Sequence, residues 1–211
     1  MNKFPSIGVS RHRIATDGRG VTTLVAAHGC PLKCRYCLNP QCAVGKPRQI
    51  FTVESLYEAV AADSLYFEAT GGGVTFGGGE PLLWAEFVAE FIRYARKEGR
   101  SWHFSAETSL AVPEAKLAAV MPYIDEYIVD IKDADPEIYR AYTQREITET
   151  MENLRRLSSE PDKVIIRTPL IKGYNSKSDV DNTVKKLRSM GFCRFDRFVY
   201  KTEIKKIPTS S

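Results

Sequence analysis

The chain has 211 residues, of which 43% are apolar and 27% charged, a composition that predicts one globular domain and excludes a disordered chain. Its formal net charge of +4 is too small to indicate a nucleic-acid-binding protein, and no apolar stretch is long enough to cross a membrane. Because the N-terminus also lacks the apolar core of a secretory signal, we expect a cytoplasmic protein that contacts neither membrane nor nucleic acid.

Strand-like and helix-like segments alternate along the chain. β-branched or apolar runs predict strands over residues 21–27, 74–77, 102–107, 123–132, 163–170 and 194–200. Apolar residues at helical spacing predict helices over residues 53–67, 84–98, 113–121, 136–142, 147–157 and 179–190. This alternation indicates a parallel sheet with outer helices, either doubly wound or an incomplete barrel. Both architectures place ligands at the carboxyl ends of the strands.

A cysteine cluster follows the first predicted strand. Cys30, Cys34 and Cys37 have the spacing C-x3-C-x2-C, and three thiolates in one loop can hold three corners of an iron–sulfur cluster. Zinc is the alternative, with Cys42 or His28 as the fourth ligand, and free thiols are the remaining one. We expect Cys42 and Cys193 to be spectators, because cysteine is often buried as a small apolar side chain.

A glycine-rich segment, GGGVTFGGGEP over residues 71–81, contains the end of the second predicted strand. Glycines at this place allow the backbone to approach a ligand closely, whereas the simpler interpretation is a flexible turn. The segment lacks the third glycine that a dinucleotide-binding loop requires.

Together these two motifs resemble the radical S-adenosylmethionine (radical SAM) superfamily. Within it, the chain is similar to the glycyl-radical-enzyme activating enzymes, of which the pyruvate formate-lyase activating enzyme is the type. The similarity extends to Asp17-Gly18-Arg19-Gly20 for the group's D-G-P-G, and to the pairs Glu107-Thr108 and Asp130-x-Lys132. It continues to Arg167–Asn175 and covers residues 10 to 200, with Gly77 replacing a serine and Lys172 a proline.

The resemblance implies a site for two cofactors. A [4Fe–4S] cluster is expected on Cys30, Cys34 and Cys37, with S-adenosylmethionine (SAM) on its open iron. The residues implied for SAM or a neighbouring monovalent cation are Tyr36, Gly78, Gly79, Glu80, Glu107, Thr108, Asp130, Lys132, Arg167 and Pro169.

Each expected role has its own chemistry. The backbone of Gly78, Gly79 and Glu80 would meet the SAM amino group, and Tyr36 would lie against the adenine. Lys132 would neutralise the SAM carboxylate or bond the ribose.

The remaining expected roles concern the cation and the cavity wall. Glu107, Thr108 and Asp130 would hold the monovalent cation, whereas Arg167 and Pro169 would line the cavity. The simpler alternatives are a strand-end ion pair for Asp130 and Lys132, and a carboxylate partner for Arg167. For Tyr36 the alternative is ordinary packing.

The implied protein is a single radical SAM domain over residues 1–211, folded as a partial (βα)6 TIM-like barrel. It would reductively cleave SAM to a 5′-deoxyadenosyl radical, which abstracts a hydrogen atom to activate a partner glycyl radical enzyme. The electron donor would be a flavodoxin or a ferredoxin. The alternatives are a radical SAM enzyme that modifies a small molecule or peptide, and a non-catalytic zinc or iron–sulfur module.

Charge patterning bears on the partner. Residues 11–48 hold seven Lys or Arg against one acid, and residues 185–206 hold eight against two. These are either solvated side chains or a face for an acidic partner. We expect a wide opening of the barrel rimmed by residues 185–206, because residues 204–211 are too short for a covering helix. Lys201 occupies the position of a histidine in the related enzymes.

Overall fold

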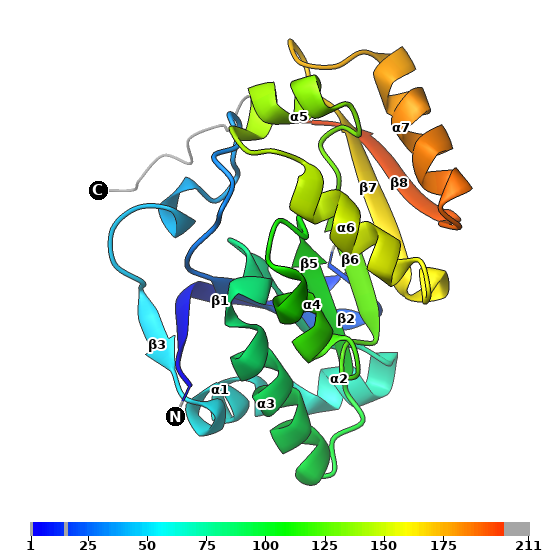
Figure 1. Cartoon of the computed structure of the whole chain (residues 1–211). Helices are drawn as coiled ribbons and strands as arrows, with labels where there is room; N and C mark the ends of the chain where they lie inside the picture. The colour runs from blue at the N-terminus through cyan, green and yellow to red at the C-terminus, as the bar shows by residue number, and fades with distance from the viewer. Residues whose placement is uncertain (1, 15–16, 201–211) are drawn as a thin grey trace.

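In the computed structural model, residues 2–14 and 17–200 are described, and they form one eight-stranded sheet with helices on its outer side (Figure 1). The strands are β1 (Phe4–Ile14), β2 (Val21–Ala27), β3 (Gln49–Phe51), β4 (Gly73–Gly78), β5 (His103–Thr108), β6 (Glu126–Asp130), β7 (Val164–Leu170) and β8 (Arg194–Val199). The helices are α1 (Val53–Ala61), α2 (Ser64–Thr70), α3 (Ala85–Lys97), α4 (Glu114–Val120), α5 (Pro136–Thr143), α6 (Thr148–Leu157) and α7 (Lys177–Ser189). Short 3-10 helices cover Pro40–Cys42, Pro81–Trp84 and Pro161–Lys163.

The sheet order distinguishes between the two predicted architectures. The order is β3-β1-β2-β4-β5-β6-β7-β8. The six predicted strands, β2 and β4 to β8, are neighbours in this order and run parallel to one another. A doubly wound sheet reverses its strand order at one point, whereas these six neighbours follow the chain sequentially. The prediction of a partial (βα)6 barrel is therefore confirmed.

Two strands were not predicted. β1 pairs antiparallel with β2, and β3 pairs antiparallel with the first residues of β1. The pairing of β1 with β2 shifts register twice, and His12 between Ser10 and Arg13 has a positive φ of 54°. These irregularities interrupt the apolar–polar alternation by which a strand is recognised.

The predicted helix over residues 53–67 is two helices instead of one. The side chain of Thr52 caps α1, and the helical conformation is interrupted at Asp63 before α2 begins. The buried Asp63 carboxylate accepts hydrogen bonds from Arg11 Nε at 2.8 Å and Thr23 Oγ1 at 2.6 Å. Contacts of Asp63 with β1 and β2 therefore determine where the helix is interrupted. These contacts cannot be predicted from the local spacing of apolar residues.

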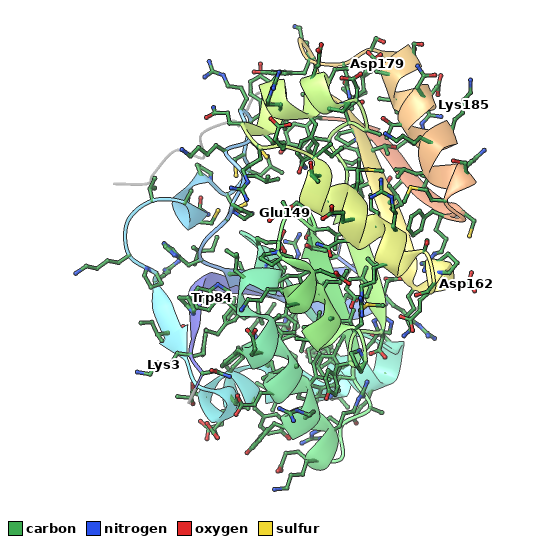
Figure 2. All side chains as sticks on the ribbon, viewed as in Figure 1. Lys3, Trp84, Glu149, Asp162, Asp179 and Lys185 are labelled. Carbon is green, nitrogen blue, oxygen red and sulfur yellow. The ribbon has the colours of Figure 1, made fainter. Side chains whose placement is uncertain are left out.

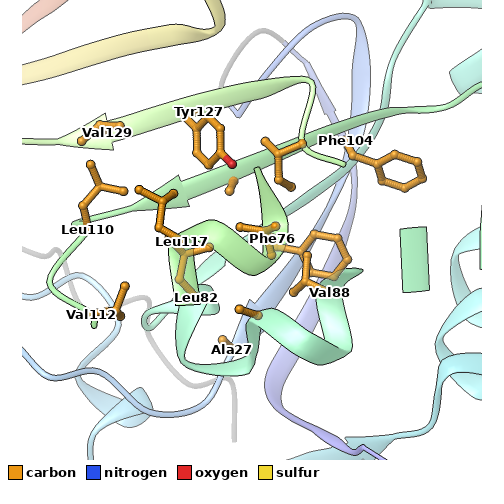
Figure 3. Packing of buried hydrophobic residues seen from close by; sticks show 14 of the residues in the cluster. Ala27, Phe76, Leu82, Val88, Phe104, Leu110, Val112, Leu117, Tyr127 and Val129 are labelled. Atoms are coloured by element: carbon orange, nitrogen blue, oxygen red, sulfur yellow. The ribbon is translucent and has the colours of Figure 1, made fainter. Parts of the chain in front are cut away.

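The hydrophobic core lies between the sheet and its helices. Figure 3 shows Phe76, Phe104 and Tyr127 from the strands against Val88 of α3 and Leu117 of α4. The buried face of α3 includes the apolar positions of the predicted helix over residues 84–98. The carboxyl ends of the parallel strands lie beyond this core, together at one edge of the barrel. Among the described residues, no helix has the length and apolar character needed to span a bilayer.

Candidate active site

A cavity of about 320 Å³ lies at the carboxyl ends of the parallel strands. It brings together ten of the predicted site residues: Cys30, Cys34, Cys37, Gly78, Gly79, Glu80, Glu107, Thr108, Asp130 and Lys132. Its wall also contains residues that sequence reasoning assigned no role: Arg13, Asp17, Leu24, Leu32, Leu38, Asn39, Ser109 and Tyr200. Segments more than a hundred residues apart in sequence therefore meet around one space.

The cysteine loop follows β2 and is held by main-chain hydrogen bonds to distant elements. Lys33 N–H donates to Thr143 O at 2.9 Å, and Arg35 N–H donates to Tyr142 O at 3.1 Å, so α5 supports the loop from outside. Cys30, Cys34 and Cys37 are partly exposed within it, and all three line the cavity. The loop therefore presents three thiols to the cavity.

The three thiols differ in their electrostatic environment. Burial raises the pKa of Cys34 to about 11. A hydrogen bond with the Cys42 thiol lowers the pKa of Cys37 to about 6, and the same thiol lowers the pKa of Cys30. Cys42 is buried and Cys193 is exposed, so burial as a small apolar side chain describes only Cys42. That both cysteines are spectators stays a prediction.

The glycines after β4 are required by the close approach of the cysteine loop. Gly79 N–H donates to Ala27 O at 3.0 Å and Glu80 N–H donates to Gly29 O at 2.8 Å. A Cβ atom at Gly79 would lie 2.2 Å from Gly29 O, so no larger residue fits. Asn39 Nδ2 adds a hydrogen bond of 3.2 Å to Gly78 O. The glycine-rich segment is thus fastened to the cysteine loop and is not a flexible turn.

Glu80 is buried, and its carboxylate is occupied by protein donors. It accepts hydrogen bonds from Thr108 Oγ1 at 2.6 Å, Ser109 N at 2.9 Å, Ser109 Oγ at 2.7 Å and Leu82 N at 3.2 Å. Burial raises the pKa of Glu80, and these four donors oppose the rise. The side chain therefore ties the end of β4 to the end of β5.

Lys132 and Asp130 form an ion pair in the cavity wall. Lys132 Nζ lies 3.5 Å from Asp130 Oδ2 and 5.5 Å from the ring centre of Tyr200. Burial works to lower the pKa of Lys132, but Asp130 and the other acidic groups nearby hold it above its ordinary value. The predicted strand-end ion pair exists, and it leaves a permanent cation that can face an anionic ligand.

Arg167 lies next to the cavity without being part of its wall. Arg167 Nη1 donates to Glu107 Oε1 at 2.6 Å, and Arg167 Nε lies 3.6 Å from Asp196 Oδ2. Burial raises the pKa of Glu107, and the charge of Asp130 adds to that rise. Arg167 therefore has the carboxylate partner that the simpler interpretation expected. Pro169, two residues further along β7, is also outside the cavity wall.

Tyr36 packs within a group of tyrosines. Its ring lies 6.2 Å from that of Tyr142 and 6.0 Å from that of Tyr174, centre to centre. Tyr200 Oη donates to Tyr36 O at 2.8 Å and so joins the end of β8 to the cysteine loop. These contacts are those of the packing alternative, and contact of Tyr36 with an adenine stays a prediction.

Arg13 and Asp17 are an ion pair in the cavity wall that the sequence did not assign. Asp17 is buried, and its carbonyl oxygen accepts a hydrogen bond from Thr75 Oγ1. The motif Asp17-Gly18-Arg19-Gly20 marked this segment, but nothing in the motif identified Arg13 as the partner. The pairing follows from the fold of the β1–β2 connection against the barrel interior.

The donor set fits an iron–sulfur cluster together with a zwitterionic ligand. Three cysteine sulfurs from one loop are the ligands that such a cluster uses. Cys42, the candidate fourth zinc ligand, is buried and is not among the residues that line the cavity. Across the cavity, Lys132 offers a cation, and Gly78, Gly79 and Glu80 at the end of β4 line the wall. The volume also falls within the usual range for small-molecule pockets.

Comparison with known proteins gives one consistent family. The sequence model of the Radical SAM superfamily matches residues 24–187. The (2S)-3-sulfopropanediol dehydratase activating enzyme of Klebsiella oxytoca is 40% identical over 75% of this chain and 69% of its own length. The pyruvate formate-lyase 2-activating enzyme of Escherichia coli is 31% identical over 75% of this chain and 64% of its own length.

Solved structures support the fold. SuiB of Streptococcus suis bound to S-adenosylmethionine aligns with 92% of this chain and 43% of its own, with a TM-score of 0.67 and 14% identity. QueE of Escherichia coli aligns with 94% of this chain and 95% of its own, with a TM-score of 0.52 and 12% identity.

Proposed function

The chain belongs to the radical SAM superfamily, whose members use a [4Fe–4S] cluster and SAM, and we propose that it activates a partner glycyl radical enzyme. One observation carries the proposal: the three thiols of the C-x3-C-x2-C loop open onto the same cavity as Lys132 and the end of β4. The curated relatives named above, both activating enzymes, support the choice of reaction.

Cys30, Cys34 and Cys37 would hold the cluster, which when reduced supplies the electron that cleaves SAM. The Asp130 carboxylate, 3.5 Å away, stabilises the charge of Lys132. Lys132 would therefore be present as a cation and would pair with the SAM carboxylate. Carbonyl oxygens at the end of β4 would accept from the SAM ammonium group, and Glu80 ties that strand end to Thr108 and Ser109. Glu107, Thr108 and Asp130 lie together in the wall and offer oxygens for a monovalent cation.

The partner would enter through the open side of the barrel. Six parallel strands do not close, and β8 is the last strand of the sheet with most of its residues exposed. Lys185 projects outward from α7 beside this edge (Figure 2). Arg194 and Arg197 on β8 pair with Glu126 and Asp181, so they are not free charges awaiting an acidic partner. Lys201 lies outside the described residues.

The electron donor would dock on the outer surface of the cysteine loop. Lys33, Arg35, Lys46 and Arg48 are exposed there, and no acidic residue occurs between positions 30 and 53. Leu38 and Val44 add apolar surface, with 56% and 66% exposed. This combination fits an acidic flavodoxin or ferredoxin, since opposite charges steer a small protein to the site.

The electron donor is tested by the double variant Lys33→Glu, Arg35→Glu. SAM cleavage driven by a flavodoxin should fall, while cleavage driven by dithionite should be unchanged, because a small reductant needs no docking surface. The double variant Arg93→Glu, Lys97→Glu, at two exposed positions of α3, is the charge-matched control. Equal loss with both reductants would show that the substitutions damage the site instead.

The proposed function is tested by anaerobic reconstitution with iron and sulfide. The reduced protein should convert SAM to methionine and 5′-deoxyadenosine, and with the correct glycyl radical enzyme from the same genome it should give a doublet glycyl-radical EPR signal. Cys30→Ala should remove the chromophore and the cleavage, and Cys193→Ala should preserve both. Hydrogen abstraction from a small metabolite, with no signal on any protein, would contradict the proposal.

A further inference from the structure

Tyr200 is the residue through which the end of β8 reaches the cavity. It follows the last residue of β8, and its N–H donates to Leu170 O at 2.8 Å, so the pairing of β8 with β7 continues up to this residue. Tyr200 lines the cavity and is only 9% exposed. Its ring and its hydroxyl therefore face other protein groups and the cavity, and little of either faces the outer surface.

The hydroxyl of Tyr200 contacts the cysteine loop. Tyr200 Oη donates to Tyr36 O at 2.8 Å, and Tyr36 lies between the motif cysteines Cys34 and Cys37. The acceptor is a main-chain carbonyl, which cannot rotate to another partner without moving the loop itself. This hydrogen bond therefore fixes the cysteine loop relative to β8, on a strand that the loop does not otherwise pair with.

The ring of Tyr200 contacts the ammonium group of Lys132. Lys132 Nζ lies 5.5 Å from the ring centre, within the range of about 6 Å for a cation–π interaction. Nζ lies 3.5 Å from Asp130 Oδ2, whereas a charge-assisted hydrogen bond between an ammonium group and a carboxylate is about 2.7–2.9 Å long. The ammonium group is thus shared between the carboxylate and the ring. A cation in this position is available to a second anion in the cavity, which all three residues line.

We propose that Tyr200 is a positioning residue with two separable contacts: its ring holds the Lys132 ammonium group in place for the SAM carboxylate, and its hydroxyl fixes the cysteine loop. The inference rests on the proposed SAM site. Without the ring, the ammonium group is free to close on Asp130, and SAM must draw it away from that carboxylate on binding. The ring therefore acts on SAM affinity through Lys132, whereas the hydroxyl acts on the loop whether or not a ligand is bound.

The alternative is that Tyr200 only fills space. Its ring centre also lies 6.3 Å from those of Tyr142 and Phe198, so it has packing partners apart from Lys132. If packing were its only role, the loss of SAM affinity on removing the ring would be the same with and without the ammonium group. Positioning requires that the loss disappear when the ammonium group is absent.

The hydroxyl contact is tested in the unloaded protein by amide hydrogen exchange. Lys33 N–H and Arg35 N–H are the reporters, because both are hydrogen-bonded to α5 and exchange only when the loop opens. Tyr200→Phe removes the hydroxyl and keeps the ring, so exchange of both amides should rise about twofold to tenfold. Tyr174→Phe is the matched control, since Tyr174 packs against the same Tyr36 ring and its hydroxyl bonds to no described residue. Unchanged exchange in Tyr200→Phe would overturn this part of the inference.

The ring contact is tested by equilibrium binding of SAM to reconstituted proteins, normalised to their iron content. For Tyr200→Leu we expect the SAM dissociation constant to rise about threefold to tenfold, whereas Tyr200→Phe should stay within about twofold of wild type. In a Lys132→Ala background, Tyr200→Leu should cause no further loss, because the ring acts through the ammonium group.

Two results would overturn the role of the ring: wild-type affinity in Tyr200→Leu, or losses that simply add in the double variant. A Tyr200→Phe protein that binds SAM as weakly as Tyr200→Leu would also contradict it. If the wild-type protein takes up a cluster but binds no SAM, the proposed function itself fails. The exchange of Lys33 and Arg35 then still decides the role of the hydroxyl, because that measurement needs neither cluster nor SAM.

Discussion

Replacing Glu80 by alanine tests whether this carboxylate supports the site through the protein or binds the ligand directly. The substitution removes the acceptor of two main-chain donors, the buried Leu82 N and the partly buried Ser109 N, and of the hydroxyls of Thr108 and Ser109. The hydroxyls can rotate to other acceptors, but the main-chain donors cannot. Each unsatisfied buried donor costs about 1–3 kcal/mol, so we expect the free energy of unfolding to fall by about 2–6 kcal/mol.

Glu80→Gln is the conservative variant. The glutamine amide keeps the side-chain volume and one acceptor oxygen. Its NH2 group, however, must face at least one of the groups that now donate hydrogen bonds to the carboxylate. We therefore expect a smaller loss, about 1–3 kcal/mol. Glu86→Gln is the control, because Glu86 pairs with Lys116 across an exposed surface and such pairs contribute about 0–1 kcal/mol.

The assay is anaerobic urea unfolding, followed by tryptophan fluorescence and paired with a SAM-binding titration of each reconstituted variant. Loss of SAM affinity should accompany loss of stability in Glu80→Ala, because the end of β4 is no longer tied to the end of β5. If Glu80→Ala unfolds like Glu86→Gln but no longer binds SAM, Glu80 is a direct ligand and the reasoning is refuted.

The remaining predictions concern other contacts of the fold. Lys132→Ala should weaken SAM binding by about 1.5–3 kcal/mol while the cluster survives, as calorimetry and iron analysis would show; unchanged affinity would leave Lys132 as a plain ion-pair partner. Gly79→Ala should lower the iron content per chain, because its Cβ would lie 2.2 Å from Gly29 O and displace the cysteine loop; normal iron content would refute this. Burial raises the pKa of Asp63, but Arg11 and its other donors hold it below its ordinary value of 3.8. The stabilisation by Asp63 is therefore present above about pH 5 and lost as pH falls through the lowered pKa, so unfolding curves of Asp63→Asn should be less stable at pH 7 and depend less on acid than those of wild type.

The sequence was sufficient for β2, β4, β5, β6 and β7 because each contains apolar residues that the core buries. β8 was also predicted, although most of its residues are exposed. The sequence was insufficient for β1, where Ser10, Arg11 and His12 are exposed and polar, and where pairing with β2 passes through two register shifts. The break between α1 and α2 was missed for a related reason. It depends on the contact of Asp63 with Arg11, which lies 52 positions earlier in the chain.

The spacing of motifs along the chain predicted which strand ends meet, and the cavity contains most of the residues that those motifs named. It did not predict which atoms each side chain contacts. Glu80 is occupied by Thr108 and Ser109, and Arg167 turns to Glu107. These orientations depend on neighbours from other strands and loops, which no local pattern encodes.

The hydrogen bond from Tyr200 to Tyr36 joins residues 164 positions apart and has a consequence for biosynthesis. Ribosomes extend a chain at about 5–20 residues per second, so Tyr200 is added roughly 8–33 s after Tyr36. The thiols of the cysteine loop are therefore made long before α5 and the end of β8 can cover them. During that interval they are open to iron carriers and to oxidants in the surrounding solution.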